Sequence, residues 1–286
     1  MNRNATAPKL YADLHLHTHH SDGALSVQEL IDLCSKKNLH CISITDHDTL
    51  DAYKTAKKIA DKAQIEIIPG IEISSIWEGR DIHILGYFID PTNLALNLEL
   101  EKFTIYRVDR VKAILQKLKT LGIELSYEKV LAKSQGKIVG RPHIALLLVS
   151  EEYCSSFNEA FDKYIGDGKP AYVKKNGLNP EQTIRLIENA GGIAVLAHPY
   201  KSGITETFIH QLVQWGIKGI ETYTPSQKKT VARKYRQIAK HFKLIGSGGS
   251  DFHAQGLTHS PGYMKMPYSV VQRLKECHEH SRIERF

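Results

Sequence analysis

The sequence predicts an α/β fold, a barrel of the β/α type with about seven strands and a helical insertion. Three observations support this prediction. Short apolar and β-branched runs alternate with helical patterns, about seven such runs occur, and the alternation stops between residues 95 and 170. Repeated strand-then-helix units favour parallel strands joined by helical crossovers, and seven strands favour a barrel over an open sheet.

The first part of the chain is expected to alternate between strands and helices. Ser26 and Glu29 have the spacing of a capping box, in which each side chain bonds the other residue's backbone N–H at a helix start. A turn is expected at Pro69 and Gly70. The predicted elements are strand 11–17, helix 26–38, strand 40–45, helix 50–63, the extended segment 65–75 and strand 80–88.

The rest of the chain resumes this alternation after a helical block. From about residue 93 to 164 the pattern is rich in Lys, Glu and Leu and contains no convincing strand. We therefore expect a barrel formed by residues 1–94 and 171–286, with residues 95–170 as a helical insertion. The later predicted elements are helix 181–189, strand 192–198, a helix ending at Trp215, strand 217–223, helix 226–241 and strand 243–253.

Composition limits the class of protein. The 286 residues are 42% hydrophobic, enough for one large domain or for one domain with an insertion. The net charge of +7 favours anionic partners only weakly, and a solvated basic surface is an equally good interpretation. The four cysteines form no CxxC pair, and no apolar leader or membrane-length apolar run occurs. We therefore expect a cytoplasmic protein without disulfides or membrane contact, and infer no stable protein partner.

The segment YADLHLHTHHSDG, residues 11–23, concentrates histidines and carboxylates. A solvated, tag-like cluster is one interpretation and a metal site is the other. Similar residues follow the other predicted strands, and strand ends in a parallel barrel point to one common mouth. These candidates are His15, His17, Asp46, His47, Glu72, His83, His198, Asp251 and His253. Imidazole and carboxylate groups without cysteine are typical of a site for a hard-to-borderline metal ion.

Several motifs carry a resemblance to a known family. DLHLHT with SDG, TDHD, PGIEIS, HILGY, AHPY and GSDFH occur in this order and cover most of the chain outside the helical block. Together they resemble the polymerase and histidinol phosphatase (PHP) superfamily, and above all its bacterial stand-alone phosphoesterases. Those relatives act on nucleoside 3′,5′-bisphosphates and on the 5′ ends of short RNA. The resemblance implies a distorted (β/α)7 barrel whose helical insertion carries a GRPHIA-like stretch, here Gly140 to Ala145.

The resemblance also implies three divalent metal ions, because no ligand position is missing. His15, His17 and Asp251 would hold the first ion, Glu72 would bridge it to a second held by His83 and His198, and Asp22, His47 and His253 would hold the third. Six histidine ligands disfavour Mg²⁺, which prefers oxygen donors. Mn²⁺ is expected, with Fe²⁺ or Zn²⁺ as alternatives. Asp13 and Asp46 are expected to orient the ligands through hydrogen bonds, and Asp48 either does the same or caps the next helix.

Residues in and after the helical block are candidates for the substrate site. The resemblance implies that Arg141 and His143 form a phosphate clamp, so that the insertion contributes to this site. The alternative is an ordinary helix start with Pro142 in the first turn. His143 is expected either to protonate the leaving oxygen or to hydrogen-bond the phosphate. Lys169 and Lys174, with Tyr172 and Lys175, either line the mouth or are solvated.

The sequence therefore favours a metal-dependent phosphoesterase in which a metal-activated hydroxide attacks phosphorus at a trinuclear site. The expected substrate is a nucleoside 3′,5′-bisphosphate, the 5′ end of a short RNA, or both. A histidinol-phosphate-type or other small-molecule phosphatase of the superfamily is the first alternative. An amidohydrolase would place a bridging lysine on the fourth strand, where this chain has His83. A non-enzymatic RNA-binding module is disfavoured by the complete ligand set.

Overall fold

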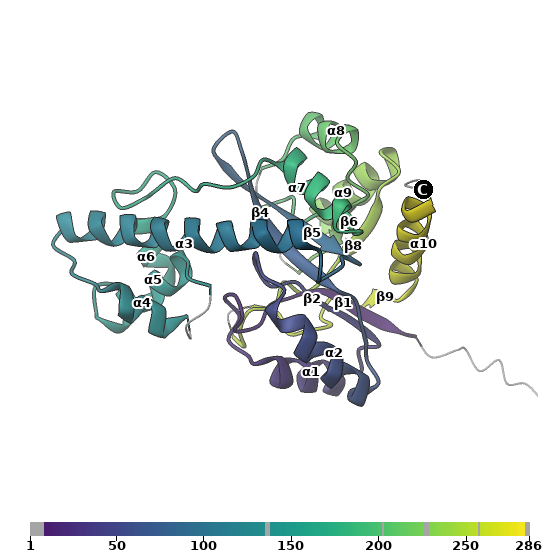
Figure 1. Ribbon diagram of the computed structural model, residues 1–286, viewed down its shortest axis with the longest axis horizontal. Helices are drawn as coiled ribbons and strands as arrows, with labels where there is room; N and C mark the ends of the chain where they lie inside the picture. The colour runs from purple at the N-terminus through teal and green to yellow at the C-terminus, as the bar shows by residue number, and fades with distance from the viewer. Residues whose placement is uncertain (1–8, 135–137, 202, 226–228, 257, 284–286) are drawn as a thin grey trace, which may run out of the picture.

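Two β-sheets with helices packed against them form the framework of the protein (Figure 1). The computed structural model describes residues 9–134, 138–201, 203–225, 229–256 and 258–283. Within these residues no helix is both long and apolar enough to cross a membrane.

The smaller sheet has the strand order β3-β2-β1-β9 and the larger sheet the order β4-β5-β6-β7-β8. The strands are β1 Tyr11–Leu16, β2 Cys41–Ile44, β3 Glu66–Ile67, β4 Gly70–Trp77, β5 Arg80–Tyr87, β6 Ile193–Leu196, β7 Gly219–Tyr223, β8 Ile245–Gly248 and β9 Met266–Pro267. β9 lies beyond residue 253, after the last predicted strand.

The expectation of a parallel barrel is wrong in part. β5 pairs antiparallel with both of its neighbours, β4 and β6, and the described residues form no closed barrel. Only Glu78 and Gly79 connect β4 to β5, and both have positive φ, 50° and 78°. A two-residue turn of this kind suits a hairpin and leaves no room for a crossover helix. The fold is therefore mixed α/β.

Two single bridges connect the two sheets. Leu16, at the end of β1, pairs with Phe252, and His47, which follows β2, pairs with Glu72 of β4. Each of the four residues is a candidate ligand or the direct neighbour of one in the sequence. The two sheets therefore meet where the candidate ligands lie.

Helices pack on both sheets, and their buried faces form the core. Ser26 accepts the N–H of Glu29 and the Glu29 carboxylate accepts that of Ser26, which confirms the predicted capping box of α1. In Figure 1, α1 and α2 lie beside β1 and β2, whereas α7 to α9 lie beside the larger sheet. The bounds are α1 Val27–Lys36, α2 Asp51–Ala63, α7 Pro180–Asn189, α8 Glu206–Gln214, α9 Lys229–His241 and α10 Ser269–Ile283.

Between β5 and β6 the chain forms a helical segment with a buried cluster of its own. It consists of α3 Leu94–Thr120, α4 Tyr127–Lys133, α5 Arg141–Ser150, α6 Phe157–Ala160 and the π-helical turn η1 Phe161–Ile165. The start of α3, including Phe103, packs against the core of the larger sheet. Its end, including Ile114, packs against α4 and α5. Figure 1 shows α3 extending away from the sheets, so this helix connects the two cores.

Candidate metal centre

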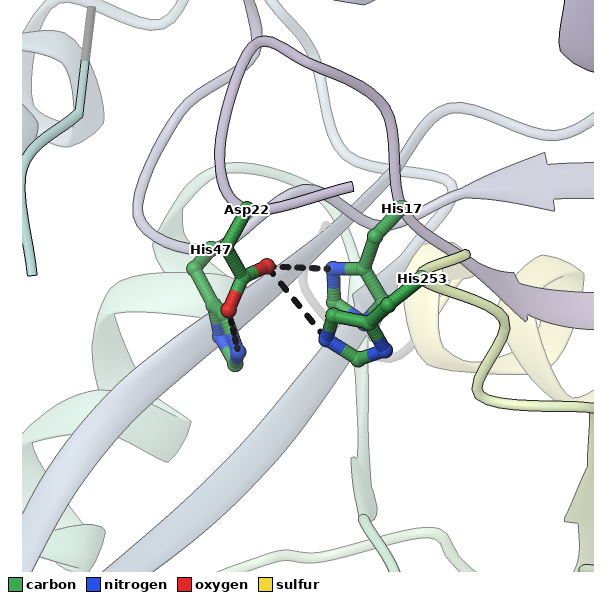
Figure 2. A group of neighbouring side chains, drawn as sticks. All are labelled: His17, Asp22, His47 and His253. Atoms are coloured by element: carbon green, nitrogen blue, oxygen red, sulfur yellow. Dashed lines mark ion pairs between the residues drawn. The ribbon is translucent and has the colours of Figure 1, made fainter. Parts of the chain in front are cut away.

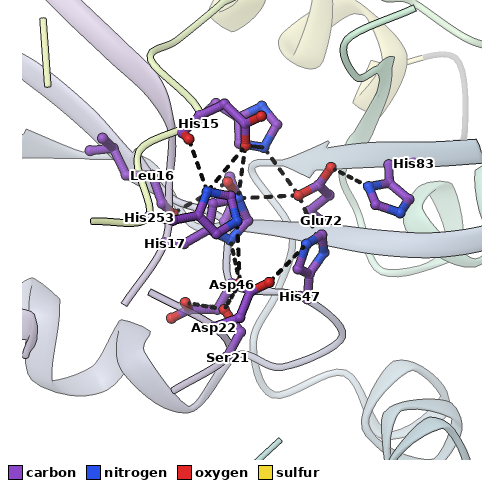
Figure 3. Close-up of polar contacts among 12 residues, drawn as sticks. His15, Leu16, His17, Ser21, Asp22, Asp46, His47, Glu72, His83 and His253 are labelled. Carbon is purple, nitrogen blue, oxygen red and sulfur yellow. Dashed lines mark hydrogen bonds and ion pairs between the residues drawn. The ribbon is translucent and has the colours of Figure 1, made fainter. Parts of the chain in front are cut away.

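The candidate ligands from both sheets come together in one cluster, which lies where the sheets meet (Figure 3). We call it the ligand cluster: His15, His17, Asp22, His47, Glu72, His83, His198, Asp251 and His253. His15 and His17 lie two residues apart at the end of β1, so their side chains point to the same side of the strand. Both are fully buried, which is unusual for two ionisable side chains in contact with carboxylates.

Glu72 lies at the centre of the ligand cluster and is almost fully buried. Its Oε2 atom lies 3.1 Å from Nε2 of His15, 3.2 Å from Nε2 of His17 and 3.3 Å from Nδ1 of His47. Two ligand atoms about 2.1 Å from one ion and about 90° apart are separated by about 3 Å. These contacts therefore have the spacing of ligands that share an ion.

The other oxygen of Glu72 faces a different pair of histidines. Its Oε1 atom lies 2.9 Å from Nδ1 of His83 and 2.9 Å from Nε2 of His198. His83 comes from the middle of β5, the antiparallel partner of β4, and not from the end of a parallel strand. The hairpin of β4 and β5 therefore brings both Glu72 and His83 to the cluster.

Asp251 and Asp22 complete two groups on opposite sides of His17. Oδ1 of Asp251 lies 3.3 Å from Nε2 of His15 and 3.4 Å from Nε2 of His17. Figure 2 shows Asp22 between His17, His47 and His253, with its nearest contact, 3.3 Å, to Nε2 of His253.

Three groups within the described residues have ligand atoms close enough to hold an ion: His15, His17, Glu72 and Asp251; His17, Asp22, His47 and His253; and His47, Glu72 and His83. The first contains the four residues expected around the first ion. The second contains the three expected for the third ion, with His17 added. The third group shares Glu72 and His83 with the residues expected around the second ion. His198 contacts Glu72 but belongs to none of the three groups.

The hydrogen bonds of the buried histidines also fit a metal ion. The ring nitrogens of His17 lie 3.2–3.8 Å from the carboxylates of Glu72 and Asp22, but these contacts lack hydrogen-bond geometry, and Nδ1 of His198 has no hydrogen-bond partner among the described residues. Nδ1 of His15 lies 3.0 Å from a carboxylate oxygen of Glu221, which can only accept, so Nδ1 carries a proton. Nε2 of His15 then faces the carboxylates of Glu72 and Asp251, and it needs either a second proton or a cation.

The carboxylates of the cluster remain ionised despite their burial. Burial raises the pKa of Glu72, but the neighbouring histidines, led by His47, outweigh burial and hold that pKa well below its usual range. Burial lowers the pKa of His17, and the carboxylates of Asp251 and Glu72 raise it to about 10. Protons on His15 and His17, whose pKa values the carboxylates raise, therefore balance part of the buried negative charge, and metal ions binding to these nitrogens would replace such protons.

The three aspartates expected to orient the ligands form hydrogen bonds with backbone and side-chain groups other than the imidazole rings; Asp13 contacts a candidate ligand through the backbone N–H of His15, at 3.3 Å. Asp46 accepts hydrogen bonds from the N–H of Thr18 at 2.7 Å and from the hydroxyl of Ser21 at 2.7 Å. This fixes the loop between His17 and Asp22. Asp13 accepts the N–H groups of Ser250 and Gly262, which precede and follow Asp251 and His253, and Asp48 accepts that of Ser74 in β4. Their partners are backbone and side-chain groups of loops, strands and α3, not the imidazole rings.

A cleft with several basic side chains lies beside the ligand cluster. We call it the basic cleft: Arg107, Arg110, Arg141 and Lys175 line it together with Asp22, His47 and His83 of the cluster and with Asp48 and Asp81. Arg107 donates to Asp48, with 2.9 Å between Nε and Oδ2. Arg110 donates from Nε to the carbonyl of Val173, but its buried Nη2 has no partner among the described residues.

Arg141 lies in the basic cleft but is held by acidic residues. Its Nη1 lies 2.5 Å from Oδ1 of Asp167, and its Nη2 lies 3.4 Å from Oδ2 of Asp81. The guanidinium carbon also lies 5.7 Å from the ring centres of Phe161 and Tyr172. These contacts fix its direction, and the two carboxylates occupy N–H groups that could otherwise bind a phosphate.

The other predicted substrate residues lie outside this lining. Lys169 and Lys174 are exposed and do not line the basic cleft. His143 is buried in the first turn of α5, where its Nδ1 accepts the N–H of Gly140 at 3.1 Å. Burial lowers the pKa of His143, which favours the neutral ring.

The arrangement of buried histidines around a shared carboxylate is matched by a known family. A model of the PHP domain matches residues 13–178. The chain belongs to the PHP family.

Two PHP relatives align over most of the chain. The 5′-3′ exoribonuclease of Haemophilus influenzae is 36% identical over 245 residues, covering 84% of this chain and 89% of the relative. The 3′,5′-nucleoside bisphosphate phosphatase of Chromobacterium violaceum is 32% identical over 249 residues, covering 85% and 87%.

Solved structures share the fold. A protein described as an amidohydrolase from Chromobacterium violaceum, with bound sulfate and no metal, matches with a TM-score of 0.84 and 29% identity, over 93% of this chain and 96% of that one. A metal-dependent phosphoesterase from Bifidobacterium adolescentis matches with a TM-score of 0.86 and 24% identity, over 95% and 97%.

Four residues at or beside this PHP centre were missed by the sequence analysis. Glu221 in β7 is fully buried, with one oxygen on His15 and the other accepting the backbone N–H of His198 at 2.6 Å. Lys201 contacts Oδ2 of Asp251 at 2.5 Å. Arg107 and Arg110 line the basic cleft. Only Glu221 had a sequence signal, a carboxylate within the apolar run GIETY.

Proposed function

We propose that this protein is a metal-dependent phosphoesterase that hydrolyses nucleoside 3′,5′-bisphosphates, the 5′ ends of short RNA, or both. One observation carries the proposal. The two oxygens of Glu72 face two different sets of buried histidines, and a cleft with four basic side chains lies directly beside them. A shared carboxylate suits a multinuclear metal site, and the basic cleft suits a second phosphate. Both named relatives act on substrates of this kind, by their names.

In this proposal the ligand cluster holds three ions. His15, His17 and Asp251 would hold the first, Glu72 would be shared between it and a second held by His83 and His198, and Asp22, His47 and His253 would hold the third. The contacts of Glu72 support the bridge, because Oε2 faces His17 of the first set and Oε1 faces His198 of the second. The contacts of His17 with carboxylates, which are close but lack hydrogen-bond geometry, support a cation beside that ring. Mn²⁺ is the proposed metal, with Fe²⁺ and Zn²⁺ as alternatives suited to imidazole ligands.

When bound, divalent ions supply an acidified water as nucleophile and neutralise charge on the reacting phosphate. The chain itself positions the substrate. Arg141 is proposed to hold the phosphate that is not cleaved, because a guanidinium can bind two of its oxygens at once. Nδ1 of His143 accepts a backbone N–H, so the neutral ring carries its proton on Nε2. Nε2 is the atom proposed to donate to the leaving oxygen or to the phosphate.

We further propose that residues 1–94 and 171–286 form a distorted (β/α)7 barrel, with residues 95–170 inserted as part of the substrate site. The two single bridges between the sheets support a ring of β1, β2 and β4 to β8. The side chains of Arg107, Arg110 and Arg141, from α3 and α5, support the role of the insertion.

An amidohydrolase is a second candidate, since a structural neighbour has that name. Two observations favour the phosphoesterase. The residue that spans the two histidine sets is the carboxylate of Glu72, not a lysine, and the basic cleft favours an anionic substrate.

The test is an assay of purified, metal-depleted protein reloaded with Mn²⁺, Fe²⁺, Zn²⁺ or Mg²⁺. Adenosine 3′,5′-bisphosphate and a short 5′-phosphorylated RNA are incubated in parallel, and released phosphate and mononucleotide are measured. We expect turnover of at least one substrate, with Mn²⁺ more active than Mg²⁺. Protein that binds the ions but hydrolyses neither substrate would contradict the proposal.

A further inference from the structure

The excess of positive over negative charge in this chain equals the charge of one segment. The whole sequence contains 38 Lys and Arg and 31 Asp and Glu residues. Residues 222–250 contain seven of the basic residues and none of the acidic ones, so the remainder has 31 of each and is formally neutral. The net charge of +7 therefore belongs to the end of β7, to α9 and to the start of β8.

Four of these basic residues form a line on α9. We call it the α9 stripe: Lys229, Arg233, Arg236 and Lys240, all exposed. Their spacing of four, three and four residues places them on one side of the helix over about 16 Å. The opposite side is buried and consists of Tyr235, Ile238 and Ala239.

The stripe has no acidic partner among the residues that the structure describes. Elsewhere on the surface, basic side chains such as Lys129 and Arg185 pair with glutamates. Like charges three or four residues apart on a helix repel each other and destabilise it. A line of unpaired cations therefore weakens the isolated helix slightly, and a bound polyanion would remove that cost.

The stripe begins at the end of the molecule that holds the ligand cluster. β7 and β8 run parallel, so α9 must return from the end of one strand to the start of the next. Its first turn therefore follows the end of β7, near the point where Glu221 contacts His15 and the backbone of His198. From there the stripe runs away from the cluster along α9, which packs against β7 and β8 of the larger sheet (Figure 1).

We propose that the α9 stripe binds the sugar–phosphate backbone of a single-stranded RNA whose 5′ end lies at the ligand cluster. This inference rests on the proposed function and narrows its substrate class. A mononucleotide in the basic cleft has no further phosphates to reach the stripe, whereas an oligonucleotide does. The stripe therefore adds affinity for RNA without adding any for a nucleoside bisphosphate.

The test compares a quadruple variant, K229Q/R233Q/R236Q/K240Q, with wild type. The substrates are a 5′-phosphorylated RNA of about twelve nucleotides and adenosine 3′,5′-bisphosphate, and kcat/KM is measured over a series of KCl concentrations. The variant should lose about tenfold or more on the RNA at low salt and stay within about twofold on the bisphosphate. The log–log salt dependence for RNA should become shallower by about 0.7 per lost contact, up to about 3.

A second quadruple variant, K36Q/K37Q/K54Q/K58Q, is the matched control. It removes the same charge from exposed positions on or beside α1 and α2. An equal loss in this control would overturn the proposal, because net charge alone would then explain it. An equal loss on both substrates, or none on the RNA, would also overturn it. Thermal unfolding of both variants verifies folding.

Direct binding separates this inference from the proposed function. Fluorescence anisotropy with a 3′-labelled RNA in EDTA measures affinity without turnover. If wild type hydrolyses neither substrate, the proposed function fails. The α9 proposal then stands or falls on whether the stripe variant binds this RNA more weakly than the control variant does.

Discussion

The ligand cluster and the basic cleft adjoin each other, yet they are built in different ways. The cluster consists of short side chains on strands and loops, and these loops are fixed by buried acceptors such as Asp13 and Asp46. The cleft consists of long basic side chains from α3, from α5 and from the segment after η1. Its partners Asp81 and Asp167 are partly exposed. Substitutions in the cluster should therefore have large effects, and those in the cleft smaller and more selective ones.

The largest effect is expected for Glu72→Gln. This change removes a buried charge shared by two histidine sets, so both proposed ions lose a ligand. We expect kcat/KM to fall by more than about 100-fold, beyond the range for residues that only support a ligand. Mn²⁺ content, measured by elemental analysis, should fall by more than one ion.

His83→Ala is the comparison for Glu72→Gln, because it removes one terminal contact of the same carboxylate. It should lower the metal content by no more than one ion. Equal losses in the two variants would show that Glu72 does not bridge. Circular dichroism of the metal-free proteins verifies that both are folded.

Glu221→Gln should have the next largest effect, although this residue is in none of the three ligand groups. Its two oxygens accept from the ring of His15 and the backbone of His198, whose φ of 24° is unusual for a residue other than glycine. The single oxygen of Gln can keep only one strong contact. We expect Mn²⁺ affinity to fall by about 10- to 100-fold.

The readout for Glu221→Gln is equilibrium Mn²⁺ binding, followed by electron paramagnetic resonance of the free ion. Thr222→Val, at the next position of β7, is the matched control and should bind Mn²⁺ as wild type does. Normal metal binding in Glu221→Gln would rule out its positioning role, even if activity fell.

The sequence anticipated the cluster better than the cleft, for a physical reason. Ligands such as His15 and His47 lie at strand ends, where local motifs and the rule of a common mouth apply. Glu72 and His83 were also identified, although they lie on the antiparallel hairpin of β4 and β5, to which the rule for the ends of parallel strands does not apply. Neither a local motif nor the strand-end rule points to Arg110. Its place in the cleft depends on the direction of α3, which is set by packing between two distant cores.

Arg141→Ala tests whether the cleft selects the substrate. A charge-assisted contact with a phosphate contributes about 1.5–3 kcal/mol, or about ten- to a hundredfold in kcat/KM. We expect this loss on a nucleoside 3′,5′-bisphosphate and a much smaller one on an aryl phosphate, at fixed Mn²⁺. Equal losses on both would assign Arg141 to the reaction centre or to the fold. No loss on either would leave it as a residue that merely begins α5.

The smallest effect concerns the carboxylate that now holds Arg141. Asp167 is 64% exposed and lies 2.5 Å from Nη1 of Arg141, where it competes with a substrate phosphate for the same guanidinium. An exposed ion pair contributes about 1 kcal/mol at most, so Asp167→Asn should lower KM for the bisphosphate by no more than about fivefold. The gain should disappear at high salt, because salt screens exposed charges. Asp162→Asn, an exposed acid on η1, has the same change in net charge and should leave KM unaltered. A KM that rises in Asp167→Asn would reverse the argument, because Asp167 would then hold Arg141 in the direction that binds phosphate.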